Sequence, residues 1–370
     1  MNCYSRHRDT QNVLPAPSRH ETPLAFRVVR SGIWLAASSY FNLAFGFGAN
    51  VALTRLLAPE HAGVFVFAQF LYSLLDLRTK LGVGQAFAQR KQTTGDLVGS
   101  LFVLEVGTGV GTVLIVLAAL PILRALDYSW DVVAVTLALA VVGLANSITG
   151  TAWVLLDKEL RFDRVSLVTS IAFPVSYLPA FWLAVRGGGA WSFVAQNATY
   201  ALLLLAGLWW SAWRTIPHVW ALNWRFDRQV AVQLVRFGAS IGSATLAASM
   251  VYQFDSFLVG QFAGMAALGF YDRAYRLAGW PHLLVGTIAS RAGFYTYARL
   301  QDDRLRLEKA VTMSFWIINL LAIPLGAGIF VAAPDLVHLL YGERWLPSAP
   351  FVRLLVVYSL VRPALENLAA

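Results

Sequence analysis

The sequence predicts an all-α, polytopic membrane protein with about ten transmembrane helices, and composition is the first reason. Charged residues make up 13% of the 370 residues, about half of the ~25% found in soluble chains. Hydrophobic residues make up 58%, and the mean hydropathy is +0.59. So few charges could not cover that much apolar surface in water, so most of the chain must lie in lipid. The 13 Trp and 13 Tyr residues are typical of aromatic belts at a membrane interface.

The second reason is a series of apolar segments that are long enough to cross the hydrocarbon core, which takes ~20 helical residues. The first lies between Arg30 and Arg55 and carries no charge. Taken in order, the expected spans cover residues 31–54, 62–84, 97–123, 132–156, 165–185, 187–213, 237–259, 265–290, 310–333 and 349–365.

The third reason is the distribution of basic residues over these spans. Of the 29 Lys and Arg residues, 22 fall on one side of the expected map and four on the other. Positive charge is retained on the cytoplasmic side, so we expect the N-terminus inside and residues 1–30 as a cytoplasmic tail. The net charge of +9 is then a topology signal and does not indicate a nucleic-acid partner.

A faint internal repeat suggests how the helices are grouped. Arg30-Ser31-Gly32 opens the first span, and Arg236-Phe237-Gly238 opens the seventh, about 206 residues later. Repeats of this kind are typical of transporters. The sequence therefore predicts a first six-helix bundle over 31–213, a cytoplasmic inter-lobe loop over 214–236, and an incomplete second bundle of about four helices over 237–370.

Ionisable residues inside the spans are the candidates for function, because each costs at least ~2.5 kcal/mol at mid-bilayer unless it faces protein or water. Asp272 and Arg276 lie roughly 10–17 Å into the eighth span at ~1.5 Å per residue. Their i,i+4 spacing allows them to pair, whereas Arg273 points about 100° away from Asp272. The sequence allows two roles for these residues: a structural ion pair, or a site in a cavity that binds an anion.

Five further charged residues lie in the second, third and seventh spans. Asp76, Arg78 and Lys80 lie near the cytoplasmic end of the second span, where the two cations can either snorkel to the surface or line a cavity entrance. Glu105 lies about one third of the way along the third span, and Asp255 lies toward the outer end of the seventh. These carboxylates are candidates for a coupling proton or cation, although Asp255 could equally be a helix-end residue in water.

Motifs for catalysis and metal binding are missing from the sequence. There is no Walker loop, nucleophile elbow or HExxH. The single cysteine, Cys3, excludes an intrachain disulfide framework and a multi-cysteine metal site. The sequence therefore predicts no enzyme, no cofactor and no metal site.

Six short segments, recurring in order over nearly the whole chain, carry a family resemblance. They are residues 55–63, 80–86, 158–162, 254–260, 267–277 and 342–345. With them the chain resembles the polysaccharide flippases of the multidrug/oligosaccharidyl-lipid/polysaccharide exporter superfamily. The resemblance implies an inverted V of two lobes around a central cavity, with twelve to fourteen helices in the family against about ten here.

The resemblance also implies a function and roles for the charged residues. Such proteins move oligosaccharide repeat units, linked to polyprenyl diphosphate, across the bacterial inner membrane, and other polysaccharide-assembly membrane proteins are possible partners. The diphosphate would then be bound by Arg276, Arg273 and Arg78, with Asp272 as an ion-pair partner. The coupling ion would be bound by Asp255, Glu105 or Asp76. An ion-coupled drug or cation exporter of the same superfamily, a membrane glycosyltransferase or polymerase, and a structural scaffold are the alternatives.

Overall fold

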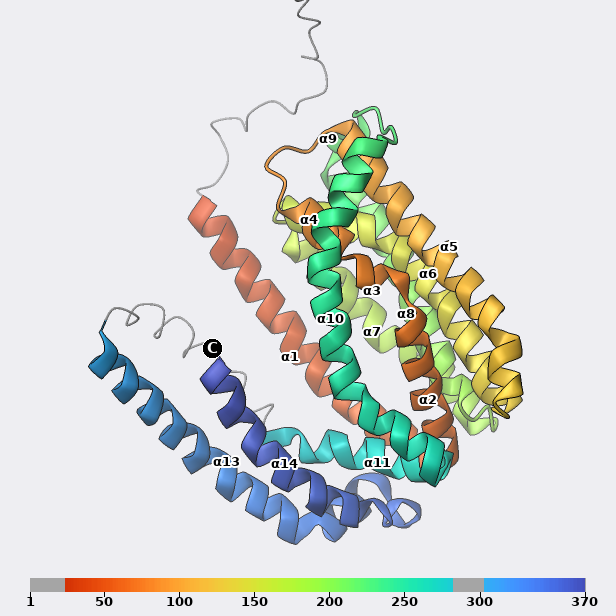
Figure 1. The fold of residues 1–370 in the computed structure, drawn as a ribbon, viewed down its shortest axis with the longest axis vertical. Coiled ribbons are helices and arrows are strands. Elements are labelled where there is room, and N and C mark those ends of the chain that lie inside the picture. The colour runs from red at the N-terminus through yellow and green to blue at the C-terminus, as the bar shows by residue number, and fades with distance from the viewer. Residues whose placement is uncertain (1–23, 282–302, 370) are drawn as a thin grey trace, which may run out of the picture. The chain divides into compact units, whose positions relative to one another are not determined.

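The computed structural model describes residues 24–281 and 303–369. Its elements are helical throughout this part of the chain, which confirms the all-α prediction (Figure 1). In order they are α1 (Leu24–Leu56), α2 (Pro59–Leu75), α3 (Leu77–Leu81), α4 (Val83–Ala88), α5 (Gly95–Ala125), α6 (Trp130–Lys158), α7 (Phe162–Val185), α8 (Trp191–Thr215), α9 (Pro217–Trp220), α10 (Arg228–Ala263), α11 (Met265–Ala278), α13 (Arg304–Tyr341), the 3₁₀ turn η2 (Glu343–Trp345) and α14 (Ser348–Ala369).

Six of the described helices are long and apolar enough to cross a membrane. They are Gly95–Ala125, Trp130–Lys158, Phe162–Val185, Trp191–Thr215, Arg228–Val251 and Arg304–Tyr341. The expected first span lies inside α1, and the tenth lies inside α14, whose apolar part is shorter. The expected eighth span begins with α11, but its residues from 282 onward lie outside the described part of the chain. The chain is a multi-pass membrane protein.

The second expected span, 62–84, is wrong as one continuous helix. It is divided into α2, α3 and α4. Asp76 has an extended backbone (φ −68°, ψ 108°), and its side chain accepts a hydrogen bond from the N–H of Arg78 at 3.2 Å. Gly82 has φ +51°, a conformation that glycine adopts without steric cost. A capping aspartate and a left-handed glycine therefore end two helices within seven residues.

The described contacts divide the chain into two compact units. Unit 1 is drawn from Met1–Leu53 and Phe67–Asp255, and unit 2 from Thr54–Val66 and Ser256–Ala370. The boundary falls inside α10, whereas the sequence placed an inter-lobe loop at 214–236. That loop is partly helical, because it contains α9 and the first turns of α10. The predicted bundles, 31–213 and 237–370, and the repeat that suggested them stay predictions.

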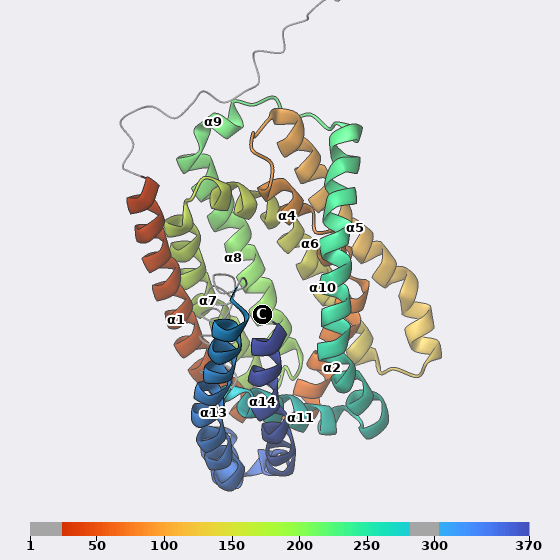
Figure 2. The ribbon, with the colours of Figure 1, turned by 60° about the vertical axis from the view of Figure 1, so that its left-hand side comes forward.

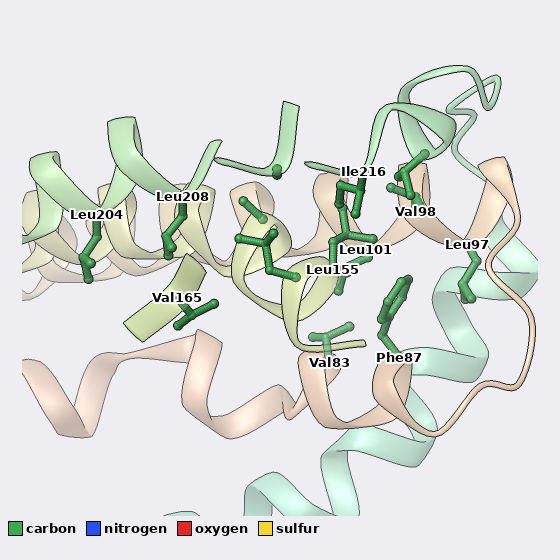
Figure 3. Packing of buried hydrophobic residues seen from close by; sticks show 14 of the residues in the cluster. Val83, Phe87, Leu97, Val98, Leu101, Leu155, Val165, Leu204, Leu208 and Ile216 are labelled. Carbon is green, nitrogen blue, oxygen red and sulfur yellow. The ribbon is translucent and has the colours of Figure 1, made fainter. Parts of the chain in front are cut away.

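Unit 1 is built around a buried layer between α4, α5, α6 and α8. Figure 3 shows Val83 and Phe87 of α4 facing Leu101 of α5, and all three side chains are at most 1% exposed. Helices α7 and α8 pack along their lengths, as do α5 and α6 (Figures 1 and 2). This layer fixes the short helices α3 and α4 against α5 and α6.

Unit 2 contains the end of α10, then α11, α13, η2 and α14, together with the short segment Thr54–Val66. Helices α13 and α14 lie side by side in both views (Figures 1 and 2). Gly63 and Gly269 allow backbone contact, because a Cβ on either would overlap the carbonyl of Met265 or of Pro59. The indole of Trp345 is fully buried, and its N–H donates to the carbonyl of Thr54 at 3.1 Å. Three of the segments that carry the family resemblance thus meet in one packed cluster.

Candidate functional site: a charged cavity in unit 1

A buried ion pair links α3 to α5. The Nε of Arg78 donates to Oε2 of Glu105 at 2.9 Å. The Glu105 side chain is 4% exposed, whereas that of Arg78 is 34% exposed. Taking a carboxylate out of water is costly unless a cation compensates it. Arg78 therefore compensates the charge of the Glu105 carboxylate while keeping part of its own guanidinium accessible.

The break between α2 and α3 is what positions Arg78 for this contact. Asp76 caps α3 through the N–H of Arg78, and Thr112 of α5 accepts from the N–H of Leu77 at 3.0 Å. A donor released by the helix break is thus satisfied by the helix that also carries Glu105. Two contacts thus hold the short helix α3 against α5, one through the backbone of Leu77 and one through the side chain of Arg78.

Helix α6 approaches the pair closely at Gly150. A Cβ at this position would lie 2.8 Å from both Nη2 of Arg78 and Oε2 of Glu105. Real Cβ atoms do not come so close to other heavy atoms, so any larger residue would displace one end of the pair. Gly150 therefore leaves the space that the ion pair occupies.

The pair forms part of the wall of a cavity within unit 1. The cavity has a volume of about 620 Å³ and is lined by Arg78, Val83, Gly84, Gln85, Ala88, Glu105, Val154, Asp157, Lys158 and Leu160. This volume lies in the range of small-molecule sites. The lining combines apolar side chains with two cations and two carboxylates, which is the composition expected of a site for a charged, amphipathic ligand.

Lys158 is the second cation of the cavity. Its Nζ is buried and has no hydrogen-bond partner among the described residues. It lies 4.5 Å from the ring centre of Phe87, close enough for a cation–π interaction. An aromatic face stabilises an ammonium ion without supplying an acceptor oxygen. The ammonium therefore keeps its capacity to donate hydrogen bonds to a ligand.

The structure brings two of the predicted site residues, Arg78 and Glu105, together at the cavity. Asp76 and Asp255 do not line it. Asp76 is buried, with 6% exposure, and acts as the cap of α3. Asp255 is half-buried in α10 and is not among the residues that line this cavity. Of the three ion-coupling candidates, only Glu105 lines it.

Asp272 and Arg276 pair in unit 2, as their i,i+4 spacing allows. The Nε of Arg276 donates to Oδ2 of Asp272 at 3.0 Å, and the Arg276 side chain is 51% exposed. The Nε of Arg273 lies 3.7 Å from the same oxygen, but this side chain is only 2% exposed. Its guanidinium lies 5.9 Å from the ring centre of Trp345. Arg273, expected to bind the diphosphate, is thus packed inside the protein, and its charge is compensated there.

Lys158, Asp157 and Gln85 were missed as site residues by reasoning from spans. Asp157 and Lys158 end α6, and charges at a helix end are ordinarily explained by solvent. Lys158 and Gln85 do lie inside two of the segments that carry the family resemblance. The position of both residues in such segments was the sequence signal that could have identified them, since it relates α4 to α6 although they lie far apart in the sequence.

Comparison with known proteins places the chain in a family. The family model described as "Polysaccharide biosynthesis protein" matches residues 52–350. The lipopolysaccharide biosynthesis protein WzxC of Escherichia coli is 22% identical over 344 residues, which cover 91% of this chain and 68% of that protein.

Two solved structures show the fold. An inward-facing multidrug resistance transporter of the MATE family, in the MOP superfamily, is matched with a TM-score of 0.62 at 16% identity, covering 89% of this chain and 81% of that one. The lipid II flippase MurJ, in an inward closed conformation, is matched with a TM-score of 0.62 at 12% identity, covering 91% and 76%. The described chain thus has the fold of these transporters. Since the family model covers most of its length, the chain belongs to the polysaccharide biosynthesis protein family.

Proposed function

We propose that this protein is a flippase that moves oligosaccharide repeat units, linked to polyprenyl diphosphate, across the bacterial inner membrane for polysaccharide export. The observation that carries the proposal is the charged cavity of unit 1, found in a chain that combines a polysaccharide biosynthesis family with a transporter fold. A diphosphate cannot cross ~30 Å of hydrocarbon without compensation of its charge. The cavity offers both cations and apolar walls for such a headgroup.

Arg78 and Lys158 are the groups that we assign to the diphosphate in unit 1. A guanidinium matches phosphate oxygens with a planar fork of donors, whereas an ammonium acts as a point charge. In unit 2 we assign Arg276 to the same headgroup during transport, since its side chain is half exposed. Arg273 is assigned to holding Asp272 in place, because it is buried under Trp345.

Orientation and partners follow from charge and chemistry. We propose that the N-terminus is cytoplasmic, as the bias of 22 basic residues against four supports. The membrane and the lipid-linked oligosaccharide are the partners, and membrane proteins that polymerise or export the polysaccharide are further candidates. The protein performs no covalent chemistry and needs no cofactor in this proposal.

Deleting the gene in the organism that carries it tests the proposal. Lipid-linked repeat units should accumulate and surface polysaccharide should be lost, and a plasmid copy of the wild-type gene should restore both. The Arg78→Ala variant should fail to restore export. The Gly107→Ala variant is a matched control on the same helix as Glu105, because a Cβ there meets no atom within 4 Å. Normal export in the deletion strain would contradict the proposal.

An ion-coupled drug or cation exporter is the second candidate, and the carboxylates of the cavity favour it. Glu105 and Asp157 line the same space as the cations, and the fold matches a multidrug transporter as well as a flippase. The two functions are separated by ligand charge. Protection of the purified protein against thermal unfolding by lipophilic cations, with none by diphosphates, would favour the exporter.

A further inference from the structure

We infer that Glu105 and an anionic ligand compete for the guanidinium of Arg78, so that protonation of Glu105 admits a diphosphate to the cavity of unit 1. The inference rests on the proposed function and adds the coupling between proton and substrate. Its basis is a single contact: the donor group best suited to a phosphate is already bound to a carboxylate at 2.9 Å.

The charges that line the cavity cancel while this pair is intact. Arg78 and Lys158 supply two positive charges, and Glu105 and Asp157 supply two negative ones. Adding a proton to Glu105 leaves the lining with one net positive charge. A cavity that is neutral in one state and cationic in the other binds an anion better in the second, because Coulomb attraction is strong where water is scarce.

Every helix packed on this part of α5 contributes to the same balance. From the α3 segment, Arg78 faces Glu105 and the charge of Asp76 also acts on it. Helix α6 supplies Asp157 and Lys158, and α4 supplies the neutral Gln85. Asp76 caps α3, and Lys158 lies over Phe87. Glu105 accepts from the Nε of Arg78, so its protonation releases this donor.

Burial makes the exchange all-or-none for Glu105. Its side chain is 4% exposed, so it is held either by Arg78 or by a proton. Arg78 is 34% exposed and can turn toward the cavity when the carboxylate is neutral. The proton comes from water and binds an oxygen of Glu105, and the ligand takes the released guanidinium. When the ligand leaves, the proton returns to water and the ion pair forms again.

Thermodynamic linkage gives the inference a measurable form. If protonation favours the ligand, the ligand must favour protonation by the same factor. One proton should then be taken up per ligand bound, and affinity should fall by about tenfold per pH unit once Glu105 is deprotonated in the free protein.

The test measures binding by the purified full chain in detergent micelles. The probes are geranylgeranyl diphosphate and inorganic pyrophosphate, with geranylgeraniol as the uncharged control, from pH ~5 to ~8. The Glu105→Gln variant mimics the protonated state. We expect it to bind diphosphate as tightly at high pH as the wild type does at low pH. At each pH we divide the affinity of the wild type by that of Glu105→Gln, because this ratio removes the effect of protonation of the ligand itself.

A steric variant tests the pair without changing its charges. Gly150→Ala places a methyl group against both ends of the pair and should raise the affinity of the cavity for diphosphate at high pH. Gly107→Ala, on α5 but facing open space, should leave affinity unchanged. Calorimetry on the wild-type protein in two buffers of different ionisation enthalpy should report about one proton taken up, after correction for pyrophosphate.

Each outcome points to one conclusion. If Arg78→Ala binds both diphosphates as the wild type does, the site of the proposed function is wrong. If Arg78→Ala loses binding but Glu105→Gln follows the pH dependence of the wild type, only the competition is wrong. Tighter binding of the prenylated probe indicates a lipid-linked headgroup, whereas equal binding of both probes indicates a site for free diphosphate.

Discussion

Unit 1 and unit 2 each contain a cluster of arginine and carboxylate in an apolar setting, yet the two clusters are built differently. In unit 1 the helix breaks at Asp76 and Gly82, and Arg78 reaches across to Glu105 on another helix beside a cavity. In unit 2, Asp272 pairs with residues of its own helix, and the buried Arg273 packs under Trp345.

The difference separates charge that holds a fold together from charge that is available to a ligand. Intrahelical pairs at i,i+4 need no partner helix and no space. A pair between two helices at a helix break requires a gap, and a gap beside a cavity can take another molecule. The role of a charged residue in an apolar segment thus depends on whether its partner lies on the same helix or on another helix beside a cavity. Four experiments test this interpretation and the membrane topology that it assumes.

Arg78→Ala should have the largest effect. Removing one partner of a buried pair leaves Glu105 without its cation, so the carboxyl must take up a proton or stay charged and uncompensated, at a cost of up to about 3–5 kcal/mol. We expect lower protein abundance together with loss of export. The double variant Arg78→Ala/Glu105→Ala should recover abundance but not export, measured by immunoblot and by surface polysaccharide. Recovery of export in the double variant would remove Arg78 from the site.

Trp345→Ala should destabilise unit 2 by a similar amount. Truncating a fully buried tryptophan typically costs ~3–5 kcal/mol, through lost burial and the cavity left behind. Trp345→Phe should cost about 1 kcal/mol, because it loses mainly the hydrogen bond to Thr54. Thermal unfolding in detergent measures both. Equal loss in the two variants would place the effect in the hydrogen bond instead of the packing.

Arg276→Ala should leave abundance almost unchanged, since half-exposed i,i+4 pairs contribute only ~0.3–0.5 kcal/mol. If the side chain contacts the diphosphate, export should be lost, and Arg276→Lys should restore part of it. Asp272→Asn is the control. Unchanged export in Arg276→Ala would contradict the headgroup role, whereas equal falls in abundance for Arg276→Ala and Asp272→Asn would indicate a structural pair.

The smallest expected effect concerns topology. Arg228 and Arg304 begin α10 and α13, and both belong to the basic side of the map. Cysteines at these positions, on a Cys3→Ser background, should resist membrane-impermeant thiol reagents in intact cells while the protein stays active. Labelling at either site would reverse the orientation.

Much of the fold could be predicted from the sequence, because lipid imposes a simple rule on length and polarity. Spans such as 132–156 and 165–185 fall inside single helices, α6 and α7. The break at Asp76 was not predicted, since an aspartate in an apolar run indicates function as readily as a cap. The pairing of Asp272 with Arg276 followed from helical periodicity. The pairing of Arg78 with Glu105 did not, because it depends on how two helices pack, and local pattern carries no such information.

The segment Thr54–Val66 has a consequence for how the protein is made. It belongs to unit 2, yet its partner Met265 is synthesised about 200 residues after Gly63. Translation proceeds at ~5–20 residues per second, so roughly 10–40 s pass between the synthesis of this segment and that of the residues that cover it. Trp345 arrives later still. During that interval the helix face at Gly63 lacks the residues that cover it in the folded protein, so we expect the speed of translation to affect the yield of folded protein.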